Sequence, residues 1–223
     1  MKHDTLSYPF WAEHEIEAAI APALDQMEKR RVLAYPTETV YGFGGGIDRD
    51  SVASLIKLKR RQPGKPFLLL IDGSDMVTSL DLRLSSYAGT LAARFWPGPI
   101  TLVLSGGEGR VPDALRGPEG GIAVRWTSHP AVQRLIRAHG EAITSTSANR
   151  PGVPPAMTAS EILSQWPDAI ARGELRVLDA GRLAPSEPST VVDCTGRHPR
   201  VIRRGAIDAR ALRECVPELI GDA

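Results

Sequence analysis

The sequence predicts an α/β protein built as a single large domain. Short runs of β-branched and aliphatic residues alternate along the chain with longer segments in which apolar residues recur at helical spacing. No internal repeat or low-complexity linker divides the 223 residues, and this length suits one domain with a sizeable core. The pattern therefore indicates a sheet with helices packed on it, and it leaves the order of the strands open.

Capping and breaking residues bound the predicted elements. Pro22 lies inside the first predicted helix and is a position at which this helix could break. Pro36 ends the first predicted strand. Asp50 or Ser51 is expected to cap the second helix. The predicted helices span residues 11–31, 85–95 and 160–166, with others beginning near residues 51, 130 and 208. After a loose lead-in of ten residues, the predicted strands span residues 32–35, 67–71, 95–104, 121–126, 176–178, 188–195 and 201–207, with a short one from residue 142 and a mobile loop at 105–121.

The composition is typical of a soluble globular protein, with 42% hydrophobic and 24% charged residues. A formal net charge of only +1 argues against a surface that binds polyanions everywhere, but it allows a local basic patch. Cys194 and Cys215 are too few for a disulfide framework and indicate a reducing compartment. The sequence shows no secretory leader and no apolar run long enough to span a bilayer, so it predicts a cytoplasmic protein without a membrane partner.

The stretch over residues 33–46, LAYPTETVYGFGGG, joins the end of a buried strand to a hydroxyl-rich turn and a set of glycines. Thr37 and Thr39 present short hydroxyl groups from this turn. The glycines allow positive φ values, or an approach to a ligand that a Cβ would prevent. The stretch indicates a ligand-facing turn, and a glycine-rich hairpin without a ligand is the alternative.

Hydroxyl groups and cations also gather at the ends of other predicted elements. Five cations and no acid lie within residues 57–65, although cations that complement a helix C-terminus are the ordinary explanation of such a cluster. Hydroxyl, amide and guanidinium groups bind phosphate and carboxylate oxygens, while each hydroxyl taken singly is also explained by a turn or a cap. The hydroxyl groups, which have no neighbouring acids, are those of Thr37 and Thr39, Ser145 and Ser147 with Asn149, and Ser189 and Thr190; a second pair of cations is Arg203 and Arg204.

The absence of common motifs narrows the chemistry. A nucleotide suits these groups, but the sequence contains neither G-x-x-x-x-G-K-[ST] nor G-x-G-x-x-G, so side chains would have to hold its phosphates. None of the five histidines has a nucleophile nearby in sequence, and no zinc site is encoded. The mechanism predicted for an enzyme with these residues is positioning and charge neutralisation rather than covalent attack.

Seven blocks occur together and in one order along the chain. They are YPTETVYGFG, the pair Lys59 and Arg61 followed by Lys65 and Pro66, FWPGPITLV, GIAVR, STSANRPG, STVVD and IRRGAI. In these blocks the chain resembles the YrdC-type threonylcarbamoyl-AMP synthase family in its short, single-domain form. The resemblance covers residues 15–207, with residues 1–14 as a lead-in and residues 208–223 as a short helical tail.

The resemblance implies a fold and a reaction. The fold is an α/β domain in which a twisted open mixed sheet, flanked by helices, curls around a basic cavity. The reaction joins L-threonine, bicarbonate or CO₂, and ATP into threonylcarbamoyl-AMP and pyrophosphate, with Mg²⁺ as the expected cofactor. The product would supply a transferase that makes N6-threonylcarbamoyladenosine in tRNA.

The resemblance also assigns roles to individual residues. The family's catalytic tetrad falls on Lys59, Arg61, Ser147 and Asn149, which are expected to face the ATP phosphates. Lys65 and Arg203 match further ATP-binding positions. The residues that match the threonine pocket are Thr39, Arg125, Ser145 and Ser189. Arg125 suits this role because a guanidinium group can clamp a carboxylate through two parallel hydrogen bonds.

Gln62, Phe43 and Arg204 depart from the family pattern, and none of them removes a proposed contact. Two other functions stay open. The first is a module of the same fold that binds tRNA or double-stranded RNA without adenylation activity, which would require cations spread over a surface. The second is a carbamoyl-transfer domain like that of hydrogenase maturation proteins, which would be accompanied by acylphosphatase-like and zinc-finger segments that this sequence does not contain.

Overall fold

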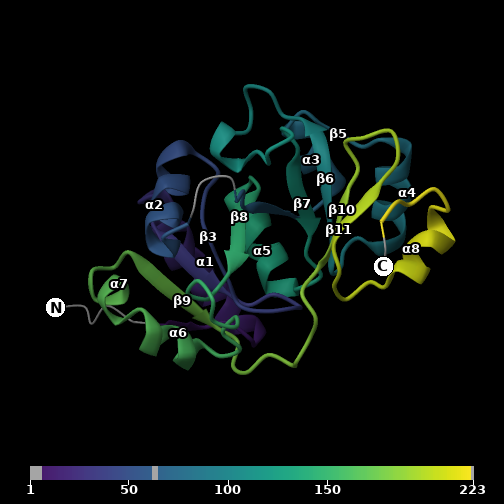
Figure 1. The fold of residues 1–223 in the computed structure, drawn as a ribbon. Helices are drawn as coiled ribbons and strands as arrows, with labels where there is room; N and C mark the ends of the chain where they lie inside the picture. The colour runs from purple at the N-terminus through teal and green to yellow at the C-terminus, as the bar shows by residue number, and fades with distance from the viewer. Residues whose placement is uncertain (1–6, 62–64, 222–223) are drawn as a thin grey trace.

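The computed structural model describes residues 7–61 and 65–221, which form one open mixed sheet with helices packed on it (Figure 1). The strands of this part are β1 (Ser7–Pro9), β2 (Val32–Tyr35), β3 (Gly42–Gly44), β4 (Leu68–Ile71), β5 (Leu82–Arg83), β6 (Ile100–Gly106), β7 (Ile122–Trp126), β8 (Ile143–Ser147), β9 (Leu175–Asp179), β10 (Thr190–Asp193) and β11 (Arg200–Arg203). They lie in the order β1-β9-β2-β3-β8-β4-β7-β6-β10-β11, and β5 pairs with β6. Parallel pairs such as β2 with β9 occur beside antiparallel pairs such as β2 with β3, so the predicted α/β class and mixed sheet are confirmed.

The helices of this part are α1 (Glu13–Glu28), α2 (Arg49–Lys59), α3 (Ser74–Ser79), α4 (Ser86–Phe95), α5 (Pro130–His139), α6 (Ala159–Gln165), α7 (Pro167–Ala171) and α8 (Ala209–Cys215), with a 3₁₀ turn at Asp113–Leu115. Six of these helices were predicted from the sequence, α3 and α7 were not, and two details of the predicted helices are wrong. Pro22 does not interrupt α1, because the buried face of this helix holds it against the sheet on both sides of the proline. The cap of α2 is Asp48, whose carboxylate accepts from the backbone N–H groups of Asp50 and Ser51.

Other boundaries differ where pairing partners could not be foreseen. The expected loose lead-in contains β1, which pairs in parallel with β9. The last strand was expected over residues 201–207, but it ends at Arg203 because the chain then turns back so that the Ala206 N–H bonds to the Pro188 carbonyl. The expectations for residues 1–6 and for Gln62 lie outside the described residues. Within the described ranges, no helix is long and apolar enough to cross a membrane.

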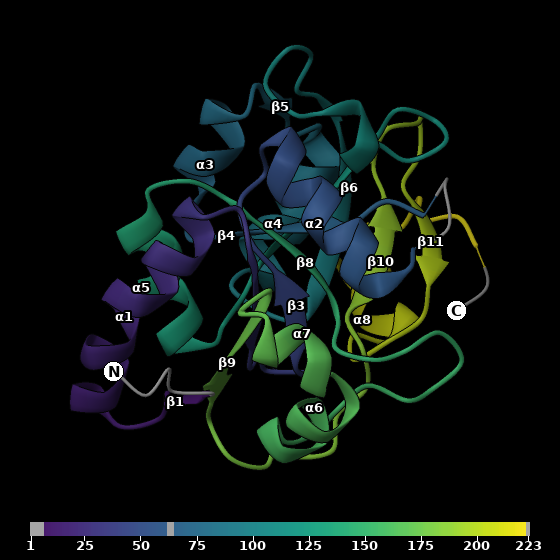
Figure 2. The ribbon, with the colours of Figure 1, turned by 90° about the vertical axis from the view of Figure 1, so that its left-hand side faces the viewer.

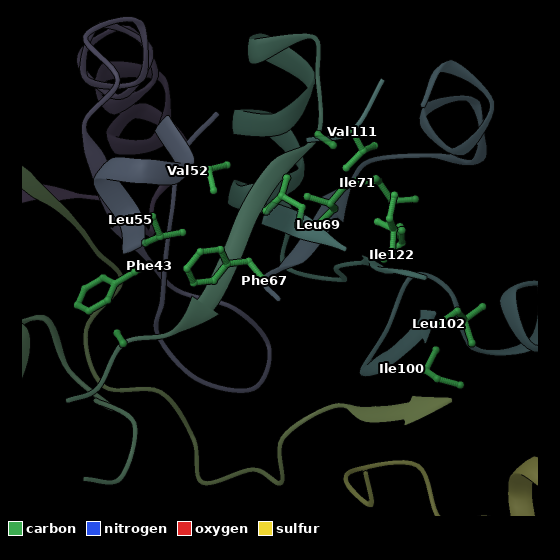
Figure 3. Packing of buried hydrophobic residues seen from close by; sticks show 14 of the residues in the cluster. Phe43, Val52, Leu55, Phe67, Leu69, Ile71, Ile100, Leu102, Val111 and Ile122 are labelled. Atoms are coloured by element: carbon green, nitrogen blue, oxygen red, sulfur yellow. The ribbon is translucent and has the colours of Figure 1, made fainter. Parts of the chain in front are cut away.

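Apolar residues on both faces of the sheet build two hydrophobic clusters. On β2, Val32 and Ala34 belong to the larger cluster, whereas Leu33 and Tyr35 belong to the smaller one, because successive side chains of a strand point to opposite faces. The smaller cluster is covered by α1 and α5, and the larger one lies beneath α2 (Figures 2 and 3). Both faces of the central strands are therefore buried in the part of the sheet that these helices cover.

The same alternation directs polar side chains to one uncovered region of the sheet. On β7, Val124 is in the larger cluster and the neighbouring Arg125 points to the opposite face, where its register partner is Leu70 of β4. Leu70 is packed in the smaller cluster with residues of α1 and α5. Farther along this face, Leu68 pairs with Ser145, and both line an open cavity instead. The cavity thus begins where the covering helices end.

The glycines of residues 42–46 act mainly in strand packing. Gly42–Gly44 is β3, which lies between β2 and β8. A Cβ on Gly44 would lie 1.7 Å from the carbonyl oxygen of Thr144 on β8. None of these glycines has a positive φ, so of the two roles expected for them the left-handed backbone is absent. The part of this stretch that lines the cavity is the preceding turn together with Gly42. These glycines let two strand backbones approach each other.

We expect Gly44→Ala to lower the free energy of unfolding by about 3 kcal/mol or more, because the backbone oxygen that its methyl group meets cannot move without breaking the sheet. Denaturant unfolding measures this. Gly89→Ala is the matched control: Gly89 lies inside α4, and no atom lies within 4 Å of the position that its methyl group would take. It should raise the free energy of unfolding by about 0.5 to 1 kcal/mol. Similar effects of the two substitutions would contradict this account of β3.

Candidate functional site

A cavity of about 820 Å³ opens on one face of the sheet, beside the β2–β3 turn and strands β6, β7, β8, β10 and β11. It brings together side chains that are far apart in the sequence. The predicted site residues that line it are Thr39, Arg61, Arg125, Ser145, Ser147, Ser189 and Arg203. Lys59, Lys65 and Asn149 are not part of this lining. Segments predicted to bind ATP and segments predicted to bind threonine therefore share one cavity.

Arg125 on β7 forms a buried ion pair with Glu38 of the β2–β3 turn. The Oε1 atom of Glu38 lies 3.1 Å from Nε and 2.7 Å from Nη2 of Arg125. Thr127 donates to Oε2 of the same carboxylate at 2.6 Å. Burial alone would raise the pKa of Glu38, but the charge of Arg125 and the hydrogen bond from Thr127 outweigh burial, so the pKa lies below its ordinary value. Glu38 is a carboxylate at neutral pH and fixes the orientation of the guanidinium group.

These contacts leave one edge of the Arg125 guanidinium group lightly bound. On this edge, Nη1 and Nη2 make long hydrogen bonds to Thr39 Oγ1, at 3.3 and 3.2 Å, in addition to the contact of Nη2 with Glu38. A ligand carboxylate that accepts two parallel hydrogen bonds would therefore use the Nη1/Nη2 edge, since Glu38 occupies the Nε/Nη2 edge. The expectation that the hydroxyl groups have no neighbouring acid is wrong at this turn: Glu38 lies between Thr37 and Thr39 and pairs with the arginine of the site.

Lys59, the last residue of α2, is buried behind the cavity wall. Its Nζ atom donates to the carbonyl oxygens of Ser147 and Asn149, and to Oδ1 of Asn149 at 2.7 Å. Ser147 Oγ donates to the same Oδ1 atom at 2.6 Å. All three donors of the ammonium group are used in this way. Lys59 and Asn149 were expected to face a ligand, and in this structure they instead hold the end of β8 so that Ser147 faces the cavity.

Arg61 is the member of the predicted tetrad whose charge faces the cavity. Its Nε and Nη2 atoms donate to the carbonyl oxygens of Lys65 and Pro66, each at 2.6 Å, and Nη1 donates to Thr146 Oγ1 at 3.1 Å. The guanidinium group stacks on the Phe67 ring, 4.5 Å from its centroid. Burial lowers the pKa of Arg61, although the group stays charged. Lys65 is exposed and supplies only a backbone oxygen to this arrangement.

Arg203 on β11 forms the opposite wall together with Ser189 and Thr101. Nε and Nη2 of Arg203 donate to the Ser189 carbonyl oxygen at 3.1 and 2.8 Å, and Nη2 also lies 2.8 Å from Ser189 Oγ. Ser189 Oγ lies 2.9 Å from Thr101 Oγ1. Burial, followed by the charge of Arg125, lowers the pKa of Arg203. Arg125 and Arg203 line the same cavity.

Sequence reasoning missed four polar residues of this region: Glu38, Thr101, Thr127 and Thr146. Thr101 lies in the apolar strand predicted over residues 95–104. Because it alternates with Ile100 and Leu102 of the larger cluster, its side chain faces the other side of the sheet and lines the cavity. Glu38 was visible between two threonines of the same turn. Thr127 and Thr146 carried no local signal, because their roles depend on which strands become neighbours.

The site suits anions better than a protein-held metal ion. The cavity lining carries the guanidinium groups of Arg61, Arg125, Arg200 and Arg203 and many hydroxyl groups, against two carboxylates, those of Glu119 and Asp193. Within residues 7–61 and 65–221, no group of three or more His, Cys, Asp or Glu side chains could hold a metal ion. The fold and the cavity together define an α/β protein with an arginine-lined cavity on one face of an open mixed sheet.

Comparisons with known proteins identify the family. Residues 25–205 match the family model Sua5_yciO_yrdC, described as "Telomere recombination". The threonylcarbamoyl-AMP synthase of Chromohalobacter salexigens is 36% identical over 175 residues, which are 78% of this chain and 91% of the relative. The synthase of Escherichia coli (strain K12) is 37% identical over 174 residues, 76% of this chain and 89% of the relative. The chain therefore belongs to the Sua5/YciO/YrdC family.

Solved structures agree with this family. The structure of P. abyssi Sua5 complexed with L-threonine matches with a TM-score of 0.81 and 29% identity, and the match covers 94% of this chain and 60% of that one. The structure of E. coli YciO matches with a TM-score of 0.77 and 27% identity, over 88% of this chain and 93% of that one. The present chain thus spans about 60% of the length of the Sua5 chain that it matches.

The burial of Lys59 makes stability depend on pH in a defined window. Burial, followed by the charge of Arg61, lowers its pKa from 10.5 to about 8. Between these values the unfolded chain binds the proton and the folded chain has released it, so the free energy of unfolding rises with pH. From pH 8 to 9 we expect a rise of about 1 kcal/mol in the wild type that is missing in Lys59→Met. Denaturant unfolding at both pH values tests this, and parallel pH profiles for the two proteins would contradict it.

Proposed function

We propose that this chain is a threonylcarbamoyl-AMP synthase that uses L-threonine, bicarbonate or CO₂, and ATP. One observation carries the proposal: three arginines from distant segments, Arg125, Arg61 and Arg203, line a single cavity that is large enough for both substrates. The names of the relatives and the L-threonine in the Sua5 structure support the same reaction. They give no support to the alternative of an RNA-binding module without adenylation activity.

In the proposed complex, the threonine carboxylate binds the Nη1/Nη2 edge of Arg125, because Glu38 holds the other edge. The long hydrogen bonds from Arg125 to Thr39 are then released. The Thr39 hydroxyl, which also lies 3.0 Å from Thr37 Oγ1, and the Ser145 hydroxyl then pair with the amino acid. A pocket that hydrogen-bonds the substrate hydroxyl rejects an analogue without it, so valine should be discriminated against more strongly than serine.

The triphosphate of ATP occupies the walls that carry Arg61, Ser147 and Arg203 in this proposal. The amine of threonine attacks the carbon of CO₂ and loses a proton, or attacks bicarbonate with loss of water, to give a carbamate. A carbamate oxygen then attacks the α-phosphorus in line, the bond to the β-phosphate oxygen breaks, and pyrophosphate leaves. Arg61 and Arg203 offset the charge that develops on the leaving pyrophosphate, so the protein acts by positioning and electrostatic stabilisation.

Mg²⁺ has no dedicated protein site among the described residues, and the cations around the proposed phosphate position do not suit a protein-held metal ion. In our proposal Mg²⁺ enters with ATP, because this ion is commonly bound through substrate phosphates and water. Transfer of the threonylcarbamoyl group to tRNA would be carried out by a separate transferase.

The proposal predicts that the purified protein releases pyrophosphate from ATP only when threonine and bicarbonate are both present. A coupled pyrophosphate assay, together with mass spectrometry of the adenylate, measures this. Omission of either co-substrate is the control. Release of pyrophosphate without threonine, or no release in the complete mixture, would overturn the assignment.

The two arginine sites should separate in steady-state kinetics. Arg125→Ala is expected to raise the KM for threonine by the equivalent of about 2 to 5 kcal/mol, because it removes a buried charge partner of the substrate carboxylate, and to change the KM for ATP much less. Arg61→Ala is the matched variant from the opposite wall and should weaken ATP instead. Equal effects of Arg125→Ala on the two substrates would remove Arg125 from the threonine pocket.

A further inference from the structure

The basic cluster at residues 57–65 serves two different cavities. Lys59 and Arg61 belong to the site described above, whereas Lys57 and Arg60 line a second cavity of about 340 Å³. Among the described residues, the linings of the two cavities have no residue in common. The second cavity lies beside the C-terminal part of α2, next to α7 and the segment that joins α7 to β9. It has no part in the proposed reaction.

Cations dominate this second cavity. Its lining contains five basic side chains, those of Arg31, Lys57, Arg60, Arg150 and Arg172, and two acidic ones, those of Asp168 and Glu174. The whole chain has a net charge of only +1, so this local excess does not reflect the average composition.

The acids of the cavity do not neutralise these cations. Glu174 binds two of them at once, with Oε1 3.2 Å from Lys57 Nζ and Oε2 3.0 Å from Arg172 Nη2. No ion pair within the described residues involves the side chain of Arg31, Arg60 or Arg150. In that part of the chain, three guanidinium groups around one small cavity therefore form no ion pair with a carboxylate.

Two of these arginines are held in ways that favour a ligand. The guanidinium group of Arg150 lies 5.5 Å from the centroid of the buried Trp166 ring and donates to the Gln165 carbonyl oxygen. Arg60 caps α2 with a left-handed backbone, at φ 48°, where glycine is the favoured residue. A non-glycine residue with a left-handed backbone is strained, and here that strained residue has a side chain that lines the cavity.

We propose that this second cavity binds a phosphate group. Guanidinium groups bind phosphate through pairs of charge-assisted hydrogen bonds, and three of them offer more donors than a single carboxylate can accept. The phosphate can come from a small molecule such as pyrophosphate or a nucleotide, or from the backbone of RNA. Both sources have the same chemistry, and the experiment distinguishes them.

The test is calorimetric titration of the full chain with inorganic pyrophosphate. If the large cavity also binds pyrophosphate as a reaction product, the wild type shows two binding events, and Arg31→Gln with Arg60→Gln weakens one of them by about tenfold or more. If the proposed function is wrong, the wild type shows a single event, and the same double variant weakens that one. The failure of one proposal is therefore distinguishable from the failure of the other.

Arg30→Gln with Arg94→Gln is the matched control, since it removes the same charge from exposed positions outside the second cavity, where Arg30 pairs with Asp48 and Asp50. It should leave both binding events unchanged. Arg60→Gly removes one cation at a position where glycine relaxes the backbone, so it should weaken the same event without loss of thermal stability. Pyrophosphate binding that is unchanged in Arg31→Gln with Arg60→Gln, or equally weakened in the control, would overturn the proposal.

The source of the phosphate follows from competition. A short RNA duplex and a mixture of free nucleotides are each titrated against bound pyrophosphate. If the duplex displaces pyrophosphate from this cavity at a lower total phosphate concentration than the nucleotides do, the ligand is the RNA backbone. Displacement by free nucleotides alone would identify a small molecule.

Discussion

The buried ammonium group of Lys59 is the interaction on which the site depends. It links the C-terminus of α2 to the segment after β8 through three oxygens, and so sets the position of Ser147 at the cavity wall. A buried cation is costly unless its hydrogen bonds are satisfied, and here the three donors and three acceptors match. The same bonds place Arg61 beside the cavity, because it follows Lys59 by two residues and turns its side chain onto Phe67. In this structure Lys59 therefore contributes to the site by holding the end of β8, which forms part of the cavity wall.

Arg125 is also a buried cation whose position is fixed by its acceptors, but its main acceptor is a carboxylate, that of Glu38. Alone, it would be a mobile cation in a large cavity, able to present any edge to a ligand. Glu38 and Thr127 remove this freedom, and the arginine becomes a donor with one defined edge. The resulting ion pair is formally neutral, so the pocket attracts a carboxylate through directed hydrogen bonds more than through net charge. Arg61 and Arg203 have no acid bound in this way among the described residues, so each presents its charge at a wall where phosphates are proposed to bind. The two acids of the lining, Glu119 and Asp193, lie near Arg200 instead.

Local sequence signals predicted most of the elements, whereas the arrangement of the site depended on strand pairing. The start of α5 and the bounds of β7 were predicted to within one residue, because Pro130 and an apolar run mark them clearly. The antiparallel contact of β3 with β8 could not be predicted from its three residues, yet it explains Gly44 and brings the β2–β3 turn close to Ser147. Thr101 was not predicted as a site residue for a related reason: the composition of a strand does not show which of its faces lines a cavity. The family resemblance identified ten site residues, but it did not distinguish those that face the cavity from those that hold its wall.

The division of the basic cluster follows from helix geometry. Residues that are two apart on a helix point about 200° away from each other, so Lys57 and Lys59 at the end of α2 cannot serve the same surface. Lys59 is buried against β8, and Lys57 faces Glu174 on the other side. A cluster that forms one run in the sequence is therefore divided between two surfaces of the fold. Lys57 and Arg60, which neither the large cavity nor a helix dipole explains, line the second cavity. Arg150 directly follows Asn149, so the segment that Lys59 anchors at one cavity also supplies a cation to the other.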